Sequence, residues 1–338
     1  MGDWISENKV LAIIIAVVLC IALAIGAIFG VKTIKSKINS NNKVEGTSSQ
    51  SNNETSDDAF VDDFSETTSQ PETETQATTE VITSSTTIKE TTTASQTVSQ
   101  TKPTQSVPTG VNTTTDGNKK IYYPAALEAL SKKYPVVVWA NGTSCPTDSY
   151  DGLLKKIADA GYIVVADASV MTANGSAQRD SIDYIISQNS NSSSVFYGKV
   201  DTVKIGATGH SQGGRSSVNA AQADSRIKCI VSIAGASSAD EARGLNTPAL
   251  FLTGTSDMIV VSSQWCKPSY DVVTGRAVYA SLKGGVHTTC MTNPDKVSDY
   301  VTSWFDAYLK GDSSAKAKFS NGGKLSTDSA WTDFASKN

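Results

Sequence analysis

Hydrophobic and polar positions divide the chain into three parts. An almost unbroken apolar run covers residues 10–31, polar residues dominate residues 32–118, and apolar clusters return in residues 119–338. In the third part, short clusters rich in valine and isoleucine alternate with longer segments whose apolar residues recur every three or four positions. This alternation predicts strands separated by helices, and the third part has the length of one substantial domain.

The predicted strands are apolar on consecutive residues, as in strands that are covered on both faces of a sheet. They are expected at residues 121–124, 135–140, 162–166, 202–207, 229–233, 249–252 and 277–280. Repeated strand–helix–strand units imply an α/β fold, with a mostly parallel sheet between two layers of helices. In such sheets the ligand site lies beyond the carboxyl ends of the strands, so the chemistry is expected on the loops at that edge.

The apolar run at residues 10–31 is long enough to cross roughly 30 Å of hydrocarbon as a helix. It predicts a transmembrane anchor that follows a short flank, residues 1–9. A secretory signal peptide is the alternative, with Ala24-Ile25-Gly26 as a cleavage site. Three lysines follow the run, so the positive-inside rule alone would place the downstream part in the cytoplasm.

Residues 32–118 are expected to form a disordered linker, because their Ser, Thr, Gln, Asn and Glu cannot bury enough apolar surface to offset the entropy of ordering. Tracts of this composition are typical of surface stalks. An anchor, a stalk and a globular domain are the layout of a cell-surface protein. We therefore expect a single-pass membrane protein with its domain outside the cell, against the positive-inside rule. Secretion after cleavage and a cytoplasmic spacer are the alternatives.

The main chemical signal is the G-x-S-x-G motif at residues 209–213, which follows an apolar strand and opens a helix of small residues. This arrangement places Ser211 on a strained turn at the top of the sheet, where glycines make room for the neighbouring strand and helix. The amides of the following helix then face any negative charge that forms at the hydroxyl. Ser211 is therefore the predicted nucleophile.

A serine nucleophile needs a base, and the chain has only two histidines. His210 is adjacent to the serine and should point into the surrounding wall, so His287, on a glycine-rich loop after the last predicted strand, is the expected base. Asp257 lies just past a strand end and would orient the imidazole. The order Ser, Asp, His is that of α/β-hydrolases. Asp240, after the preceding strand, is the alternative acid.

The oxyanion of acyl transfer needs two preorganised donors. One is expected to be the backbone N–H of Gln212, the residue after the nucleophile. The turn after the strand at residues 135–140 should supply the other, with the N–H of Thr143 preferred and an ordinary polar turn as the alternative. Asn141-Gly142-Thr143 is also a glycosylation sequon, although a glycan there would block the site.

Composition excludes several other functions. The formal net charge of −4 offers no basic surface for nucleic acid. Two histidines without an H-E-x-x-H motif or clustered carboxylates provide no set of metal ligands, and the elbow lacks the lysine of a phosphate-binding loop. We therefore expect no metal, no cofactor and no nucleic-acid partner. The oligomeric state stays open.

Four of the five cysteines lie in the C-terminal part: Cys145, Cys229, Cys266 and Cys290. An exported location would permit disulfides. Cys229 lies in an apolar run and is expected to be a buried thiol, whereas Cys290 could pair with either Cys266 or Cys145.

The amino-acid sequence around these residues also resembles that of a known protein family. The matching segments are residues 121–124, residues 197–202 leading into 209–214, the loop that ends in Ser256-Asp257, and residues 284–287. Over residues 120–310 the chain is similar to bacterial cutinases and poly(ethylene terephthalate) hydrolases, within the dienelactone-hydrolase-like superfamily. The resemblance implies an α/β-hydrolase fold with a triad of Ser211, Asp257 and His287, and an oxyanion hole of Thr143 and Gln212.

The sequence departs from that family where the acyl group would bind. Gln212 stands where the family usually has methionine, the loop at residues 234–240 lacks the usual tryptophan, and Thr143 occupies a position where an aromatic residue is common. These departures favour a smaller or more polar ester over a polyester.

We therefore expect a surface-bound or secreted serine hydrolase that cleaves carboxylic esters through an acyl-enzyme on Ser211. Its activity should fall as the pH drops through the pKa of a histidine, about 6.5 for an unperturbed imidazole. A catalytically silent binding module on the same scaffold and a serine peptidase are the alternatives.

Overall fold

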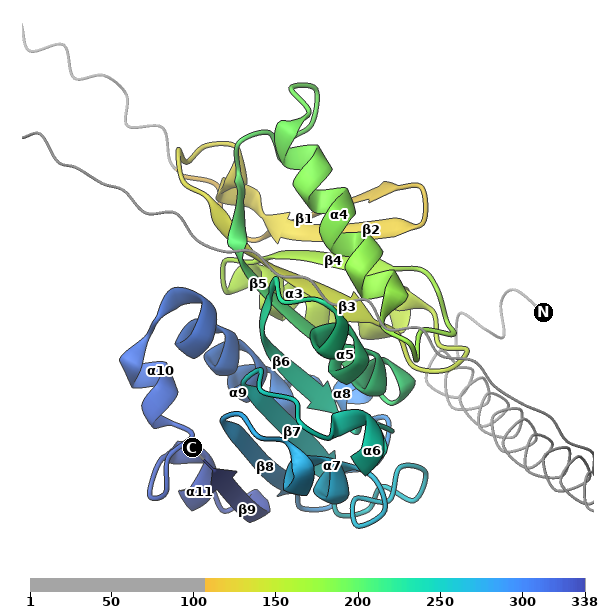
Figure 1. Cartoon of the computed structure of the whole chain (residues 1–338). Helices are drawn as coiled ribbons and strands as arrows, with labels where there is room; N and C mark the ends of the chain where they lie inside the picture. The colour runs from red at the N-terminus through yellow and green to blue at the C-terminus, as the bar shows by residue number, and fades with distance from the viewer. Residues whose placement is uncertain (1–106, 338) are drawn as a thin grey trace, which may run out of the picture. The chain divides into compact units, whose positions relative to one another are not determined.

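A nine-stranded sheet runs through the computed structural model, which describes residues 107–337 (Figure 1). Along the sheet the order is β1-β2-β4-β3-β5-β6-β7-β8-β9. The strands are β1 (Val111–Asp116), β2 (Lys119–Pro124), β3 (Tyr134–Ala140), β4 (Ile163–Asp167), β5 (Val200–His210), β6 (Ile227–Ile233), β7 (Ala249–Gly254), β8 (Ala277–Leu282) and β9 (Trp331–Lys337).

The central strands, from β4 to β8 in the sheet order, are parallel, and β1, β2 and β9 join antiparallel at the two edges. The mostly parallel sheet predicted from the sequence is thus confirmed. The order reverses at β3, because the chain passes from β3 to β4 on one side and returns to β5 on the other. In open α/β sheets, ligand sites usually lie at the carboxyl ends of the strands where the order reverses, which are those of β3 and β5 here.

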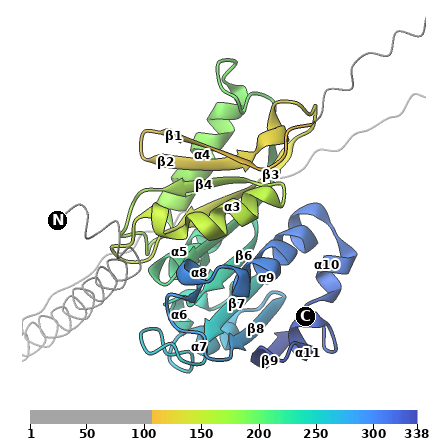
Figure 2. The same cartoon turned by 180° about the vertical axis from the view of Figure 1, so that it is seen from behind.

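Two layers of helices cover the sheet (Figures 1 and 2). One face carries α4 (Ser176–Ser190), α5 (Gln212–Ala223), α6 (Ala239–Ala242) and α7 (Cys266–Val272). The other carries α3 (Asp151–Asp159), α8 (Thr289–Thr292), α9 (Asp295–Phe305), and the single turns η2 (Thr147–Tyr150) and η3 (Asp306–Lys310). The remaining short helices are η1 (Ala125–Leu127), α10 (Ser313–Ala317) and α11 (Lys324–Thr327).

Consecutive apolar residues in the strands supply both hydrophobic cores. In β3, Val137 and Trp139 join the core beneath α3 and α9, whereas Val136 and Val138 join the core beneath α4 and α5. Side chains alternate between the faces of a strand, so a strand buried on both sides must be apolar at every position. This is why these strands could be recognised in the sequence.

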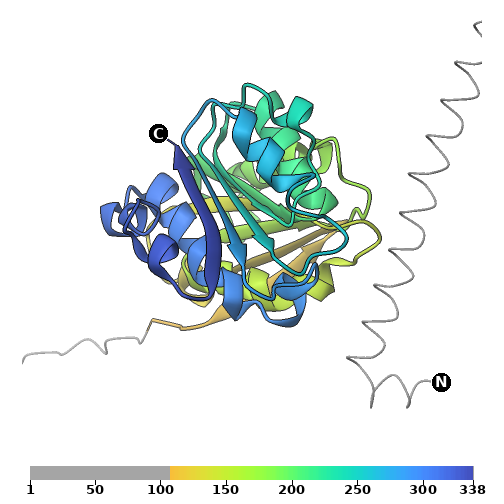
Figure 3. The ribbon, with the colours of Figure 1, turned by 90° about the horizontal axis from the view of Figure 1, so that it is seen from below.

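The two edge strands were not predicted. β1 lies inside the segment 32–118 that was expected to be a linker, so the folded part begins before the proposed boundary at residue 119. Its sequence, Val-Asn-Thr-Thr-Thr-Asp, is largely exposed and carries no apolar pattern. β9 pairs with β8 along the opposite edge (Figure 3), and its residues are only partly buried after Trp331.

The N-terminal predictions lie outside the described residues: the flank 1–9, the apolar run 10–31 and the linker up to residue 106. Between residues 107 and 337, no helix combines the length and apolar character that crossing a membrane requires.

The cysteines of the described part form no disulfide, and all four are buried. Neither of the pairings that the sequence left open for Cys290, with Cys266 or with Cys145, is formed in this structure. Cys266 packs in the core beneath α7, whereas Cys145 and Cys290 belong to the core on the other side of the sheet. Cys229 is a buried thiol in β6, as predicted.

Candidate active site

Ser211 lies on a sharp turn between β5 and α5, with φ 58° and ψ −119°. An L-residue adopts this backbone conformation only where the surroundings impose it. The Ser211 N–H donates to the carbonyl of Ile233 at 2.9 Å, and its own carbonyl accepts from the N–H of Gly214 at 3.0 Å. The turn is therefore held from the neighbouring strand and from the first turn of the helix.

Two glycines of the motif allow this turn to approach its neighbours. A Cβ on Gly213 would lie 2.0 Å from the carbonyl oxygen of Ala140, at the end of β3. A Cβ on Gly209 would lie 2.4 Å from the carbonyl oxygen of Gly213. The start of α5 thus packs directly on the end of β3.

The structure brings Asp257 and His287 together. Asp257 follows β7, His287 follows β8, and the Nδ1 of His287 lies 2.8 Å from the Oδ2 of Asp257. The other carboxylate oxygen accepts the N–H groups of Ile259 and Val260, each at 2.9 Å. Both side chains of the pair are buried, so neither is free to turn away.

The Asp257 carboxylate is an acceptor in this pair. Burial opposes its ionisation, but the hydrogen bond and charge of His287 and the two backbone N–H groups outweigh burial and lower its pKa. An ionised carboxylate can only accept, so the Nδ1 of His287 carries the proton. The Nε2 of His287 is then the ring nitrogen that can accept a proton.

Asp240, the alternative acid, lies elsewhere. It belongs to α6, its side chain is 91% exposed, and its carboxylate pairs with Arg243 at 3.1 Å. It therefore does not orient His287.

His210 joins the serine turn to the His287 loop. Its ring is buried and lies with its centroid 4.5 Å from that of His287. Its Nε2 is 2.8 Å from the His287 carbonyl oxygen. The side chain points into the protein, as its place beside Ser211 predicted. Since Ser211 is the next residue, the serine turn and the base loop are neighbours.

The turn after β3 is held mainly by the amide of Asn141. This side chain is fully buried, accepts from the indole N–H of Trp139 at 2.9 Å, and donates to the carbonyls of Asp167 and Ser169. The Ser144 N–H donates to the carbonyl of Val170 at 3.1 Å. With its amide buried and bonded, Asn141 cannot carry a glycan in the folded protein.

Two backbone N–H groups, one in the turn after β3 and one at the start of α5, have no hydrogen-bond acceptor among the described residues. Among residues 107–337, neither the Thr143 N–H nor the Gln212 N–H donates to a protein group. Gln212 is the first residue of α5, where the helix supplies no acceptor for the amide. These are the two amides that the sequence predicted for an oxyanion hole.

The side chain of Gln212 has a role that the sequence did not reveal. Its Oε1 accepts the N–H of Thr172 at 2.7 Å, and the Thr172 hydroxyl donates to the Asn141 carbonyl at 3.1 Å. Gln212 thus ties the serine turn to the loop between β4 and α4, and through it to the turn after β3. Its partner is 40 residues away, so no local pattern could have indicated this contact.

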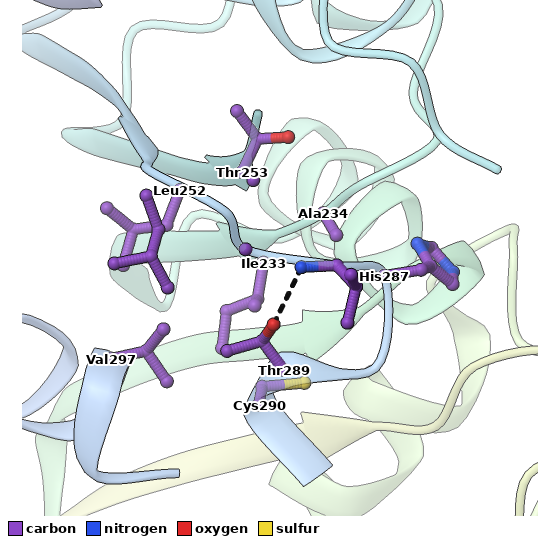
Figure 4. Close-up of a pocket in the computed structure, with 12 residues that line it drawn as sticks. Ile233, Ala234, Leu252, Thr253, His287, Thr289, Cys290 and Val297 are labelled. Carbon is purple, nitrogen blue, oxygen red and sulfur yellow. Dashed lines mark hydrogen bonds between the residues drawn. The ribbon is translucent and has the colours of Figure 1, made fainter. Parts of the chain in front are cut away.

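A small cavity lies beneath His287 (Figure 4). Its lining includes Ile233, Leu252, Cys290 and Val297, and its volume is about 20 Å³. Roughly 10–15 Å³ holds one water molecule, so the cavity is too small for a substrate. The Val286 N–H donates to the hydroxyl of Thr289 at 2.9 Å and thereby fixes the loop that carries His287.

Four apolar side chains are exposed on the loops at the carboxyl edge of the sheet. Met171 follows β4, Met258 and Ile259 follow β7, and Val286 follows β8. The serine turn lies at the end of β5, between these strands in the sheet order. None of the four is aromatic. They give this edge of the sheet an exposed apolar surface on loops that flank the end of β5 in the strand order.

Comparison with known proteins finds a matching family and a relative of the chain. The model of the family described as PET hydrolase-like matches residues 83–333. The chain is also 23% identical, over 204 residues, to the bis(hydroxyethyl) terephthalate hydrolase of Streptomyces coelicolor. That alignment covers 58% of this chain and 63% of the relative, which is less than two thirds of the relative's length.

Replacing Gly213 by alanine is expected to destabilise the protein by about 3 kcal/mol, because the new methyl group would collide with the backbone of β3. Urea denaturation of wild type and variant measures the loss. Gly198→Ala is the matched control: Gly198 has a φ of +66° but no atom within 4 Å of an added Cβ. Only backbone strain of about 1–2 kcal/mol should remain there. Equal losses would show that the close approach to β3 is unimportant.

Proposed function

Because the chain belongs to the PET hydrolase-like family, we propose that it hydrolyses carboxylic esters through an acyl-enzyme on Ser211. The observation that carries the proposal is the buried pair of Asp257 and His287, which lies beside the strained turn of the serine. Ser211 is the nucleophile, His287 the base and Asp257 the group that holds the tautomer of the base.

The proposed reaction begins with proton transfer from the Ser211 hydroxyl to the Nε2 of His287. The serine oxygen attacks the ester carbonyl, and the N–H groups of Thr143 and Gln212 stabilise the oxyanion. His287 then gives its proton to the departing alcohol, which leaves the acyl group on the serine. Water, deprotonated by His287, attacks this acyl-enzyme, and the carboxylic acid is released as Ser211 regains its proton.

Esters smaller than a polymer chain are the proposed substrates. The exposed Met171, Met258 and Ile259 offer apolar contact to an acyl or alcohol group. The loop at residues 234–240 provides no aromatic wall, and Thr143 provides none on the opposite side. The relative's name refers to bis(hydroxyethyl) terephthalate, a small diester, which agrees with this size of substrate.

We also propose that the enzyme acts at the cell surface or after secretion. The proposal rests on the sequence, in which the apolar run at residues 10–31 precedes a long polar stretch.

Ser211→Ala is expected to lower kcat for p-nitrophenyl esters by roughly 10⁴-fold or more, because the acyl-enzyme can no longer form. Esters of graded chain length would also rank the acyl groups. A fluorophosphonate probe should label the wild type and leave the variant unlabelled, with unchanged circular dichroism as the control for folding.

The same assays separate the alternatives. Wild-type turnover in Ser211→Ala would refute the assigned nucleophile. A labelled protein that cleaves amides and not esters would be a peptidase, and a folded wild type that is neither labelled nor active would be a binding module.

A single imidazole should control how the activity depends on pH in acidic solution. Burial, and then the neighbouring His287, lower the pKa of His210 to about 3, so His210 stays neutral above about pH 5. The proposed mechanism needs one imidazole nitrogen without a proton to accept the proton of the serine. A plot of log(kcat/KM) against pH should rise with a slope of +1 and then level off. A slope of +2 would show that both imidazoles titrate.

A further inference from the structure

Two buried side chains that take no part in the proposed acyl transfer connect the segments that do. Tyr150, at the end of η2, has its hydroxyl oxygen 3.1 Å from the Gly142 nitrogen and 3.1 Å from the Nδ1 of His210. The Nε2 of His210 lies 2.8 Å from the carbonyl oxygen of His287. The chain of contacts runs from the turn after β3, past the serine turn, to the loop of the base.

The donor and the acceptor of each hydrogen bond in this series of contacts follow from the chemistry of the groups. The His287 carbonyl can only accept, so the Nε2 of His210 carries the proton. The Nδ1 of the neutral ring must then accept, and the Tyr150 hydroxyl donates to it. The Gly142 N–H can only donate, and it donates to the Tyr150 oxygen. The side chain of Cys145 is a further hydrogen-bond partner of this hydroxyl.

Ring packing adds a second constraint. The ring centroids of Trp139 and Tyr150 are 4.8 Å apart, those of Tyr150 and His210 are 5.7 Å apart, and those of His210 and His287 are 4.5 Å apart. All four rings are buried. Rotation of any one ring would disturb its neighbours, so the stack keeps the hydrogen bonds aligned.

We propose that Tyr150 and His210 are positioning residues, which hold the turn of the oxyanion donor and the loop of the base at a set spacing on either side of Ser211. Asp257 controls the rotation of the His287 ring, and His210 holds the main chain of the same residue. The base is therefore located by two independent contacts. Misplacement of a reacting group by about 1 Å can cost about 10²-fold in rate.

The tautomer of His210 can be measured directly, because the chain contains only two histidines. Nitrogen-15 NMR of the imidazoles of the full chain should show two rings, and the spectrum of His210→Gln assigns them. We expect the His210 ring to carry its proton on Nε2 and to stay neutral from about pH 5 to about pH 8. In Tyr150→Phe the proton should stay on Nε2, because the His287 carbonyl still accepts it, whereas the Nδ1 resonance should shift because its hydrogen bond is lost. A wild-type His210 ring with its proton on Nδ1 would overturn the network.

The positioning role is tested by kinetics. Tyr150→Phe is expected to lower kcat for p-nitrophenyl esters about 10- to 100-fold, with little change in KM. Tyr162→Phe is the matched control, because Tyr162 is equally buried and its hydroxyl donates to Asp306 at 2.7 Å, away from the site. It should lose similar stability and keep the wild-type kcat. Equal kcat values for the two variants would overturn the proposal.

A conservative change at His210 provides a second kinetic test. The amide of His210→Gln can donate to the His287 carbonyl and accept from Tyr150, whereas His210→Leu can do neither. The glutamine variant should therefore retain at least about 10-fold more kcat than the leucine variant. Equal losses would mean that His210 only fills space.

The role inferred for Tyr150 and His210 rests on the proposed function, and the experiments distinguish the two failures. If the folded wild type hydrolyses no ester, the proposed function and the positioning role both fail, and the NMR result still decides whether the hydrogen bonds exist. If the wild type is active and the variants match their controls, the positioning role alone fails.

Discussion

The close approach of α5 to the end of β3 is the constraint on which the site depends. With no side chain at Gly213, the first turn of the helix rests on the carbonyl of Ala140. That contact places the amide of Gln212 beside the turn at residues 141–144. It also forces Ser211 into its strained conformation at the carboxyl edge of the sheet. The strand order reverses at β3, and ligand sites of open α/β sheets usually lie at the carboxyl ends of the strands beside such a reversal.

Buried and half-buried polar groups then hold the loops around the serine. Asn141, Thr172 and Gln212 connect three loops through hydrogen bonds to backbone groups, and each bond is more directional than an apolar contact. A network of this kind keeps donors in place before a substrate arrives, which is the condition for stabilising an oxyanion. Through its side chain, Gln212 thereby ties the serine turn to the other two loops.

The two histidines show how environment assigns different tasks to the same residue type. His210 is enclosed and neutral, with both ring nitrogens engaged. His287 has one nitrogen engaged by an ionised carboxylate, and the proposed mechanism uses the other as a base. Such separation of environments is a general way to divide roles among titratable groups.

The sequence by itself determined the α/β layout, the serine turn, and the chain order of Ser211, Asp257 and His287. These signals are local, because consecutive apolar residues mark doubly covered strands and a strained turn demands glycine at fixed positions. Only the tertiary structure showed that β1 and β9 form the two edges of the sheet. It also showed that Gln212 is hydrogen-bonded to Thr172, and Tyr150 to His210. Polar edge strands carry no apolar pattern, and a hydrogen bond between residues 40 or 60 positions apart leaves no local trace. Those partners meet only when the strands are arranged in their final order.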